Sequence, residues 1–468
     1  MITTETQRTQ RLHREEVSSH MSTVVALSTP RGRGALAVIR LSGPTAIAIA
    51  QQMSDLEEVE PRHATLVSLR RPKDKEILDQ VLLTCFQAPH SLTGEDVAEI
   101  SCHGSPAVVR SIIDTTLELG AMLAGPGEFT LRALSNGKIN LAQAEAIRDL
   151  IAAQTDAAVK QASRQLNGEL SNALGPFKEK LLEVIVLLES ALEFVEDDLP
   201  SVRANEIDRE LMVVAAGVEK LARSYGAGRL IQEGIRVTIT GRPNVGKSSL
   251  FNSLVERERA IVTDIPGTTR DTLTEAIDLD GIPVILTDTA GLRDTTDGIE
   301  TLGIERTRRA MSDSDLVLVV IDGADELGPS DNDLLDQTAG THRLVVLNKS
   351  DLPGFSVSRS CIESLKPINV SARTGEGLDA LRAAILSSVN SNGVKDGSLL
   401  ITNARHYDLL CSTQRELEAA RAALSERHSE ELVLVPLHNA LKFLGQITGE
   451  TTTEDILSEI FATFCIGK

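Results

Sequence analysis

The segment Gly241-Arg-Pro-Asn-Val-Gly246-Lys247-Ser248 decides the fold of the middle of the chain. It matches the pattern GxxxxGK[ST], follows the strand-like run IRVTIT and opens the helical run SSLFNSLV. In such a segment the glycines let backbone N–H groups curl around phosphates, and the helix N-terminus adds a favourable dipole. Lys247 is expected to reach the β- and γ-phosphates, and Ser248 to ligate Mg²⁺. The segment therefore predicts a phosphate-binding loop between a strand and a helix.

Three further motifs follow strand-like runs in the order typical of GTP-binding proteins. In IPVILTDTAG, Asp288 is placed to hold the Mg²⁺ shell, and the N–H of Gly291 to face a γ-phosphate. In LVVLNKSD, the carboxylate of Asp351 can accept two hydrogen bonds from the N1–H and N2–H₂ edge of guanine, which adenine lacks. The other expected base contacts are Asn348, Lys349, Ser371, Ala372 and Arg373. Together these motifs predict a GTPase domain.

The segment IVTDIPGTTRD lies between the phosphate loop and DTAG. Thr269 is the expected second hydroxyl ligand of Mg²⁺, in a switch segment that orders around the γ-phosphate; the alternative is a threonine-rich surface loop. Leu292 follows DTAG where Ras-type enzymes carry the glutamine that positions water. Because leucine cannot orient a nucleophile, another group is needed. Glu300 in the acidic stretch RDTTDGIE is the candidate, although from the residues alone a solvated acidic loop is the commoner explanation of that stretch.

Composition narrows the possible partners and environment of the chain. Its 468 residues carry a net charge of −20, and aromatic residues make up only 2%. An acidic surface repels nucleic-acid backbones, so broad nucleic-acid binding by this chain alone is disfavoured. No apolar run reaches the roughly 18 residues of a membrane-spanning helix, and the polar first 20 residues do not read as a secretion signal. Five scattered cysteines without a CxxC pair predict a reducing cytosol and no zinc site.

Changes in hydrophobic period divide the chain into segments. Short β-type runs give way to a helical region, then to alternating strands and helices typical of a parallel sheet with crossover helices, and finally to helices again. The simplest architecture is an α/β GTPase domain inserted into a helical domain; the alternative is two unrelated helical domains. The expected boundaries are a disordered leader at 1–20, a small α/β domain at 21–138, helical parts at 139–233 and 391–468, and the GTPase domain at 234–390.

The helical region at 139–233 gives more detailed expectations. The run from Leu141 places Ala144, Ile147, Ile151 and Ala158 on one apolar face. A second helix should have Pro176 near its first turn. A third should end at the glycines of SYGAG.

Several longer motifs carry a resemblance to a known family. TPRGRGALAVIRLSG, SLTGEDVAEISCHG, PGEFTLRALSNGKINLAQAEAI, the GTPase motifs and the C-terminal CIGK resemble the tRNA-modification GTPase family called MnmE or TrmE. The likeness covers nearly the whole chain after the leader. Departures from the family pattern are the leader before Met21 and Asp264 and Pro266 in the switch loop.

The resemblance implies a function and partners. It implies a cytoplasmic homodimer that works with an FAD-containing protein of the MnmG (GidA) type, which brings NADH and most of the tRNA surface. Together they install an aminomethyl or carboxymethylaminomethyl group at C5 of the wobble uridine of certain tRNAs. The one-carbon unit comes from a tetrahydrofolate derivative (5,10-methylene- or 5-formyl-tetrahydrofolate), bound by an N-terminal domain that looks like folate-binding aminomethyl-transfer domains.

The resemblance also assigns residues. It implies a K⁺ ion beside the phosphates, held by Asn244, Thr263, Ile265 and Thr268, and it places Glu300 as the water-orienting group. The folate candidates are Arg40, Glu99, Lys138 and Lys468; Cys465 is either a buried small residue or a reactive thiol near the folate. The full set expected to contact GTP is Asn244, Val245, Gly246, Lys247, Ser248, Ser249, Thr263, Asp264, Ile265, Pro266, Gly267, Thr268, Thr269, Asp288, Thr289, Ala290, Gly291, Asn348, Lys349, Asp351, Ser371, Ala372 and Arg373.

A second hypothesis from another class is a GTP-dependent assembly or signalling switch, such as a ribosome-biogenesis factor of the Era type. Against it, the GTPase segment is followed by an acidic helical segment and not by a basic RNA-binding module.

Overall fold

The computed structural model describes residues 22–193, 201–257, 259–261, 273–289, 310–355, 362–389, 399–451 and 454–467. The chain divides into two compact units. One joins Met1–Arg148 with Thr448–Lys468, and the other is Asp149–Ile447. The last residues of the chain therefore fold with its first domain.

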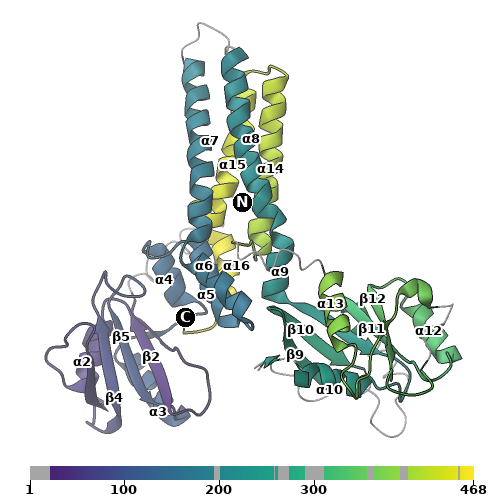
Figure 1. Ribbon diagram of the computed structural model, residues 1–468. Helices are drawn as coiled ribbons and strands as arrows, with labels where there is room; N and C mark the ends of the chain where they lie inside the picture. The colour runs from purple at the N-terminus through teal and green to yellow at the C-terminus, as the bar shows by residue number, and fades with distance from the viewer. Residues whose placement is uncertain are drawn as a thin grey trace, which may run out of the picture. The chain divides into compact units, whose positions relative to one another are not determined.

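The first unit contains a sheet (Figure 1) whose strands alternate buried and more exposed residues. Its strand order is β3-β4-β5-β2-β1-β6, with β6 parallel to β1 and the other paired strands antiparallel. Along β2, Ile39 and Leu41 are fully buried in a core that also contains Ile49 of α2 and Ile112 of α3. These helices therefore cover the face of the sheet that contains this core.

The elements of this unit have the following bounds: β1 Val24–Leu27, β2 Leu36–Ser42, α2 Ala46–Ser54, β3 Ala64–Arg70, β4 Ile77–Phe86, β5 Val97–His103, α3 Pro106–Glu118, β6 Met122–Leu123, α4 Glu128–Ser135, α5 Leu141–Ala152 (whose last turn belongs to the second unit) and α16 Glu454–Ala462.

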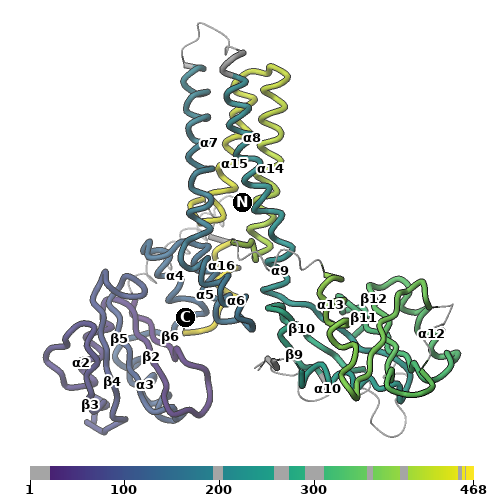
Figure 2. The backbone as a smooth tube through the Cα atoms, in the orientation of Figure 1, coloured from purple at the N-terminus to yellow at the C-terminus, as the bar shows by residue number. Residues whose placement is uncertain are grey.

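Long helices of the second unit run side by side in a bundle (Figure 2). Polar contacts join them, including His438 of α15 to Glu189 of α7 and Asn439 of α15 to Glu416 of α14. The helices are α6 Asp156–Leu166, α7 Glu169–Glu193, α8 Ser201–Arg223, α9 Tyr225–Glu233, α14 Ala404–Ser425 and α15 Glu430–Thr448. Within the described residues, every helix is too short or too polar to cross a bilayer.

Helix boundaries in this region correct three sequence expectations. The run from Leu141 is broken after Ala152, and Ile151 of its predicted apolar face is 48% exposed. Pro176 lies inside α7, which already begins at Glu169, and not near a first turn. The glycines of SYGAG do not end a helix but lie inside α9. A Cβ on Gly228 would come within 2.0 Å of the Ile401 carbonyl oxygen, so a close approach, and not a helix end, requires that glycine.

The sheet of the second unit has the order β13-β12-β11-β7-β10-β9-β8. Strands from β13 to β10 are parallel, and β9 and β8 add antiparallel edges, so the sheet is mixed and not wholly parallel. Its elements are β7 Ile235–Thr240, α10 Lys247–Arg257, β8 Arg259–Ile261, β9 Leu273–Leu279, β10 Ile282–Asp288, β11 Leu316–Asp322, α12 Pro329–Gln337, β12 Arg343–Asn348, η2 Glu363–Leu365, β13 Ile368–Asn369 and α13 Leu378–Ser388.

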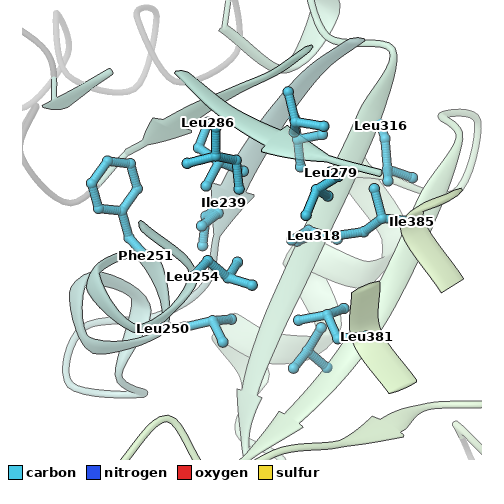
Figure 3. Packing of buried hydrophobic residues seen from close by; sticks show 14 of the residues in the cluster. Ile239, Leu250, Phe251, Leu254, Leu279, Leu286, Leu316, Leu318, Leu381 and Ile385 are labelled. Atoms are coloured by element: carbon cyan, nitrogen blue, oxygen red, sulfur yellow. The ribbon is translucent and has the colours of Figure 1, made fainter. Parts of the chain in front are cut away.

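One apolar core fixes helices α10 and α13 to this sheet (Figure 3). Leu250 and Leu254 of α10, together with Leu381 of α13, are buried with Ile239 of β7 and Leu318 of β11. Burying such a side chain stabilises the fold by about 1.5–3 kcal/mol. Because α10 begins at Lys247, this packing also fixes the phosphate loop at the end of β7.

Candidate functional site

The phosphate loop adopts a backbone that requires glycine. Asn244 has φ +64° and Gly246 φ +94°, both in the left-handed region. A Cβ on Gly241 would lie 2.4 Å from the Val320 carbonyl oxygen, and one on Gly246 would lie 2.3 Å from Nδ2 of Asn348. The loop therefore makes a tight turn between β7 and α10. The N-terminus of α10 follows this turn directly, and the backbone N–H groups at a helix N-terminus stabilise an anion such as phosphate.

The phosphate lysine and the expected Mg²⁺ ligands lie at the same end of the sheet. Lys247 is only 7% exposed, and its Nζ donates to the carbonyl oxygen of Arg242 at 2.9 Å. Ser248 Oγ donates to Oδ2 of Asp288 at 2.8 Å. Asp288 is fully buried at the end of β10, which pairs with β7. A hydroxyl and a carboxylate in contact are oxygen donors of the kind that Mg²⁺ prefers.

The base-site residues form a connected network. Asn348, at the end of β12, donates from Nδ2 to the Val245 carbonyl oxygen at 2.8 Å and accepts at Oδ1 from the Ala372 N–H at 3.0 Å. Ser371 Oγ donates to Oδ1 of Asp351 at 2.7 Å. Asn348 thus connects the phosphate loop to the loop that carries Ser371 and Ala372. The predicted motifs at the ends of three strands therefore lie close together.

The structure adds two acidic groups that motif matching missed. Asp322, the last residue of β11, accepts from Nζ of Lys349 at 2.6 Å and holds that lysine, whose φ is +68°. Arg242 of the phosphate loop pairs with Asp325 at 2.7 Å. A hydrogen bond from Arg242 to Asp325, together with neighbouring carboxylates, raises the pKa of Arg242. For Asp322, the sequence signal was its position at the end of the apolar run LVLVVID.

Part of the predicted nucleotide site lies outside the described residues. This part comprises Thr263, Asp264, Ile265, Pro266, Gly267, Thr268, Thr269, Ala290, Gly291 and Glu300. Of the neighbouring positions, Thr289 is buried and its Oγ1 donates to the Ile239 carbonyl oxygen at 2.9 Å. Val245 is likewise buried, Ser249 is exposed, and Arg373 is exposed beside the base-site loop.

Two predicted folate residues form an ion pair in the first unit. Arg40 and Glu99 face each other in register on β2 and β5, with Nη2 and Oε1 2.8 Å apart. Their side chains are 19% and 28% exposed, so the pair is neither buried nor fully solvated. The Arg40 guanidinium also lies 5.6 Å from the ring centre of Phe129 in α4. Lys138, just beyond α4, donates from Nζ to the Pro89 carbonyl oxygen at 3.0 Å.

The C-terminal tail is fixed to the same domain. The Gly127 N–H donates to the Cys465 carbonyl oxygen at 3.2 Å, and Pro126 forms a bridge with Ile466. Ser28 Oγ donates to the carbonyl oxygen of Gly467 at 2.9 Å. These contacts place the exposed Cys465 next to the start of α4, whose Phe129 lies under Arg40. Lys468 itself lies outside the described residues.

A buried arginine that the sequence reasoning missed organises this region. Arg132 is 3% exposed and pairs with Glu95 at 3.0 Å and with Glu128 at 2.8 Å. Glu128 in turn accepts from the Gly125 N–H at 2.7 Å. The network therefore holds the 125–128 loop against which the tail lies. The spacing of Glu128 and Arg132, four residues apart on one helix, was the available signal.

The cysteines of the first unit are expected to differ in reactivity. Burial raises the pKa of both Cys85 and Cys102 to about 11, so about one in a thousand of either thiol is ionised at pH 8. Cys465 is exposed. Alkylation of the native protein, followed by peptide mass spectrometry, should label Cys465 while Cys85 and Cys102 stay unmodified. Labelling of Cys85 at the rate of Cys465 would contradict this arrangement.

Comparison with known proteins shows which family the chain resembles along its length. The family model for the MnmE helical domain matches residues 141–465, and the model for the GTP-binding protein TrmE N-terminus matches residues 23–138. The tRNA modification GTPase MnmE of Koribacter versatilis is 45% identical over 95% of this chain and 99% of its own length. That of Aquifex aeolicus is 40% identical over the same shares. Among solved structures, the G domain of the T. maritima FeoB iron transporter matches 33% of this chain and 99% of its own at 25% identity, with a TM-score of 0.27.

A match at 45% identity over 99% of a relative's length shows the family to which this chain belongs. The chain is a GTPase and belongs to the MnmE (TrmE) family of tRNA modification GTPases.

Proposed function

We propose that this GTPase is potassium-stimulated and works with an FAD-containing protein of the MnmG type. Together they would install an aminomethyl or carboxymethylaminomethyl group at C5 of the wobble uridine of certain tRNAs. The observation that carries the proposal is the presence, in one chain, of a guanine-nucleotide site and of a second polar site at Arg40 and Glu99. The relatives from Koribacter versatilis and Aquifex aeolicus are tRNA modification GTPases by name, which supports tRNA as the substrate.

Nucleoside analysis of tRNA tests this function. In a strain that lacks the protein, the modified wobble uridines should disappear, and a plasmid copy of the wild-type gene should restore them. Because Lys247→Ala removes the phosphate-contacting amine, that variant should fail to restore them. Unchanged wobble uridines in the deletion strain would refute the proposal. The alternative function, a GTP-dependent assembly switch of the Era type, would then be favoured.

The proposal gives each side chain of the nucleotide site a separate role. Lys247 would neutralise the β- and γ-phosphates, and Asp351 would read the guanine edge. Mg²⁺ would be held by Ser248 and Thr269, with Asp288 in its outer shell; the contact of Ser248 with Asp288 fits that ligand set. Glu300 would orient the attacking water, because Leu292 at the usual position has no polar group.

A potassium ion beside the phosphates is part of the proposal. Asn244, Thr263, Ile265 and Thr268 would hold it; Asn244 is exposed on the phosphate loop with φ +64°. A monovalent cation there would stabilise developing charge where other GTPases insert an arginine.

Replacing K⁺ with Na⁺ is therefore expected to slow GTP turnover by about 100-fold, the effect typical of losing one preorganised electrostatic contact. Steady-state hydrolysis in matched chloride salts measures this. Asn244→Ala should be slow in both salts, whereas equal wild-type rates in K⁺ and Na⁺ would remove Asn244 as a cation ligand.

A tetrahydrofolate derivative (5,10-methylene- or 5-formyl-tetrahydrofolate) would bind at Arg40, Glu99, Lys138 and Lys468. The partly exposed Arg40–Glu99 pair suits such a ligand, because the Glu99 carboxylate can accept from an amino-pyrimidine edge and the Arg40 guanidinium can meet an anionic tail. Once bound, the folate supplies the one-carbon unit. Cys465 would be a thiol exposed near that site, since its carbonyl oxygen accepts from Gly127 beside α4.

Deleting residues 465–468 should weaken folate binding by about tenfold, the loss expected for one charged contact worth ~1.5 kcal/mol. GTP binding should be unchanged, because none of the described nucleotide-site contacts involves the tail. Calorimetric titration with 5-formyl-tetrahydrofolate and with GTP measures both. Unchanged folate affinity would remove Lys468 and Cys465 from the site.

The partners and location form the last part of the proposal. A net charge of −20 suits a chain that reaches tRNA mainly through its MnmG-type partner, since its own surface repels phosphates. We place the homodimer in the cytoplasm, with no membrane association. The domain boundaries at 20/21, 138/139, 233/234 and 390/391 belong to the same proposal.

A further inference from the structure

The hairpin formed by β9 and β10 lies in the sequence between the two segments that are expected to respond to the nucleotide. β9 begins directly after residues 262–272, which contain the expected switch segment, and β10 ends at Asp288, which contacts Ser248. The turn of the hairpin, at Asp280 and Gly281, lies at the opposite end of the strands. At about 3.4 Å per residue, that turn is roughly 20 Å from the nucleotide site.

Helix α6 of the helical region holds this turn through Thr155. Thr155 is 4% exposed, and its Oγ1 donates to the Gly281 carbonyl oxygen at 2.8 Å. The same hydroxyl accepts from the Ala158 N–H at 3.2 Å and so caps the N-terminus of α6. One side chain therefore both starts a helix and holds the GTPase hairpin.

The hairpin packs closely against helices α6 and α9. Asp280 and Gly281 have φ values of +52° and +90°, as in a two-residue hairpin turn. A Cβ on Gly281 would lie 2.8 Å from Cβ of Ala157, in the first turn of α6. A Cβ on Gly234, at the end of α9, would lie 2.2 Å from the Pro283 carbonyl oxygen of β10. Displacement of the hairpin would therefore press directly on α6 and α9.

The chain that returns from the GTPase domain is fixed to the same helices. The Leu400 N–H donates to Oε1 of Gln161 in α6, and the Ile401 N–H donates to Oγ of Ser224 beside α9. Ala158, Ile231 and Leu400 share one small buried apolar cluster. The chain segments that enter and leave the GTPase domain are thus held against α6 and α9. The hairpin turn differs from them because it lies in the sequence between the two expected switch segments.

We propose that Thr155 is a positioning residue that couples the nucleotide state to helix α6 through its hydrogen bond to Gly281. Switch segments of GTPases rearrange between the triphosphate and diphosphate states. A rigid hairpin that joins both segments carries that change to its turn, and Thr155 transfers it to α6. Helix α6 follows α5, which begins in the first unit. Through this contact, a conformational change caused by GTP hydrolysis would be transmitted beyond the GTPase domain. The inference deepens the proposed function, but it needs only the GTPase activity to be tested.

Hydrogen exchange on the full chain provides the test. In the wild type, deuterium uptake of a peptide covering residues 153–166 should differ between the GDP and GTP-analogue states. Thr155→Asp keeps an acceptor for the helix cap but has no proton for Gly281, so the nucleotide-dependent difference should fall about fivefold, as for one lost hydrogen bond. Thr155→Ser keeps both bonds and should restore it. The kcat and KM for GTP should stay within about twofold of wild type, since Thr155 contributes no described contact to the nucleotide site.

Arg382→Gln is the matched control. Arg382 of α13 pairs with Asp280 at 3.1 Å, so this variant loosens the same turn from the GTPase side without touching α6. It should keep the nucleotide-dependent signal in residues 153–166. A wild-type protein that binds GTP but shows no such signal would overturn the inference and leave the GTPase assignment intact. Equal signals in Thr155→Asp and wild type would overturn it as well.

Discussion

Replacing Asp351 with asparagine is expected to turn a GTP-selective site into one that prefers xanthosine triphosphate. The carboxylate would accept two hydrogen bonds from guanine, and Ser371 Oγ already donates to its Oδ1 at 2.7 Å, which fixes its orientation. Asparagine presents an N–H₂ donor to the donor edge of guanine, but it can donate to the C2 carbonyl of xanthine. Hydrogen bonds to a charged group contribute about 1.5–3 kcal/mol each, so losing two should weaken GTP binding about 100-fold or more.

Fluorescence titration with labelled GTP, and competition by unlabelled xanthosine triphosphate, measures the change. Asp336→Asn is the matched control, because Asp336 is exposed on α12 and makes none of the base-site contacts described above. It should bind both nucleotides as the wild type does. If Asp351→Asn kept the wild-type preference for GTP, Asp351 would not read the base.

The GTPase fold and its polar strand ends could be predicted from sequence for a physical reason. Side chains at the carboxyl ends of adjacent parallel strands meet at one edge of a sheet, so local motifs at those positions become neighbours. Asp288 and Asn348 were found in this way, and the structure brings them to the loop that holds Ser248 and Val245. Asp322 escaped notice because an aspartate at a strand end has no fixed motif around it.

Contacts between distant segments could not be predicted in the same way. Ser28 and Gly467 are 439 positions apart, yet their hydrogen bond helps to hold the tail. No period or motif in either segment specifies that pairing. Arg132 was missed for a related reason, because its partner Glu95 lies in the loop between β4 and β5, far from α4 in sequence. The helix break before Thr155 was also missed: Ala and Gln continue a helical pattern through residues 153 and 154, although the threonine caps a new helix.

Gly246→Ala should be the most damaging single-methyl change in the nucleotide site. Gly246 has φ +94°, where a side chain costs about 1–2 kcal/mol, and its Cβ would lie 2.3 Å from Nδ2 of Asn348. Asn348 would have to give up its bond to the Val245 carbonyl oxygen, which adds about 1–3 kcal/mol for buried groups left unsatisfied. Affinity for both GTP and GDP should therefore fall by about 30-fold to several thousand-fold.

Gly340→Ala separates this effect from a general glycine effect. A Cβ on Gly340 meets nothing within 4 Å, so that variant should bind GTP and GDP normally. Calorimetric titration of both variants with GDP measures the affinities, and thermal unfolding without nucleotide checks that both are folded. Because Asn348 links the phosphate loop to Ala372 as well as to Val245, Gly246→Ala should also reduce discrimination between guanine and other bases. Normal GDP affinity in folded Gly246→Ala would mean that the loop does not hold the phosphates in this conformation.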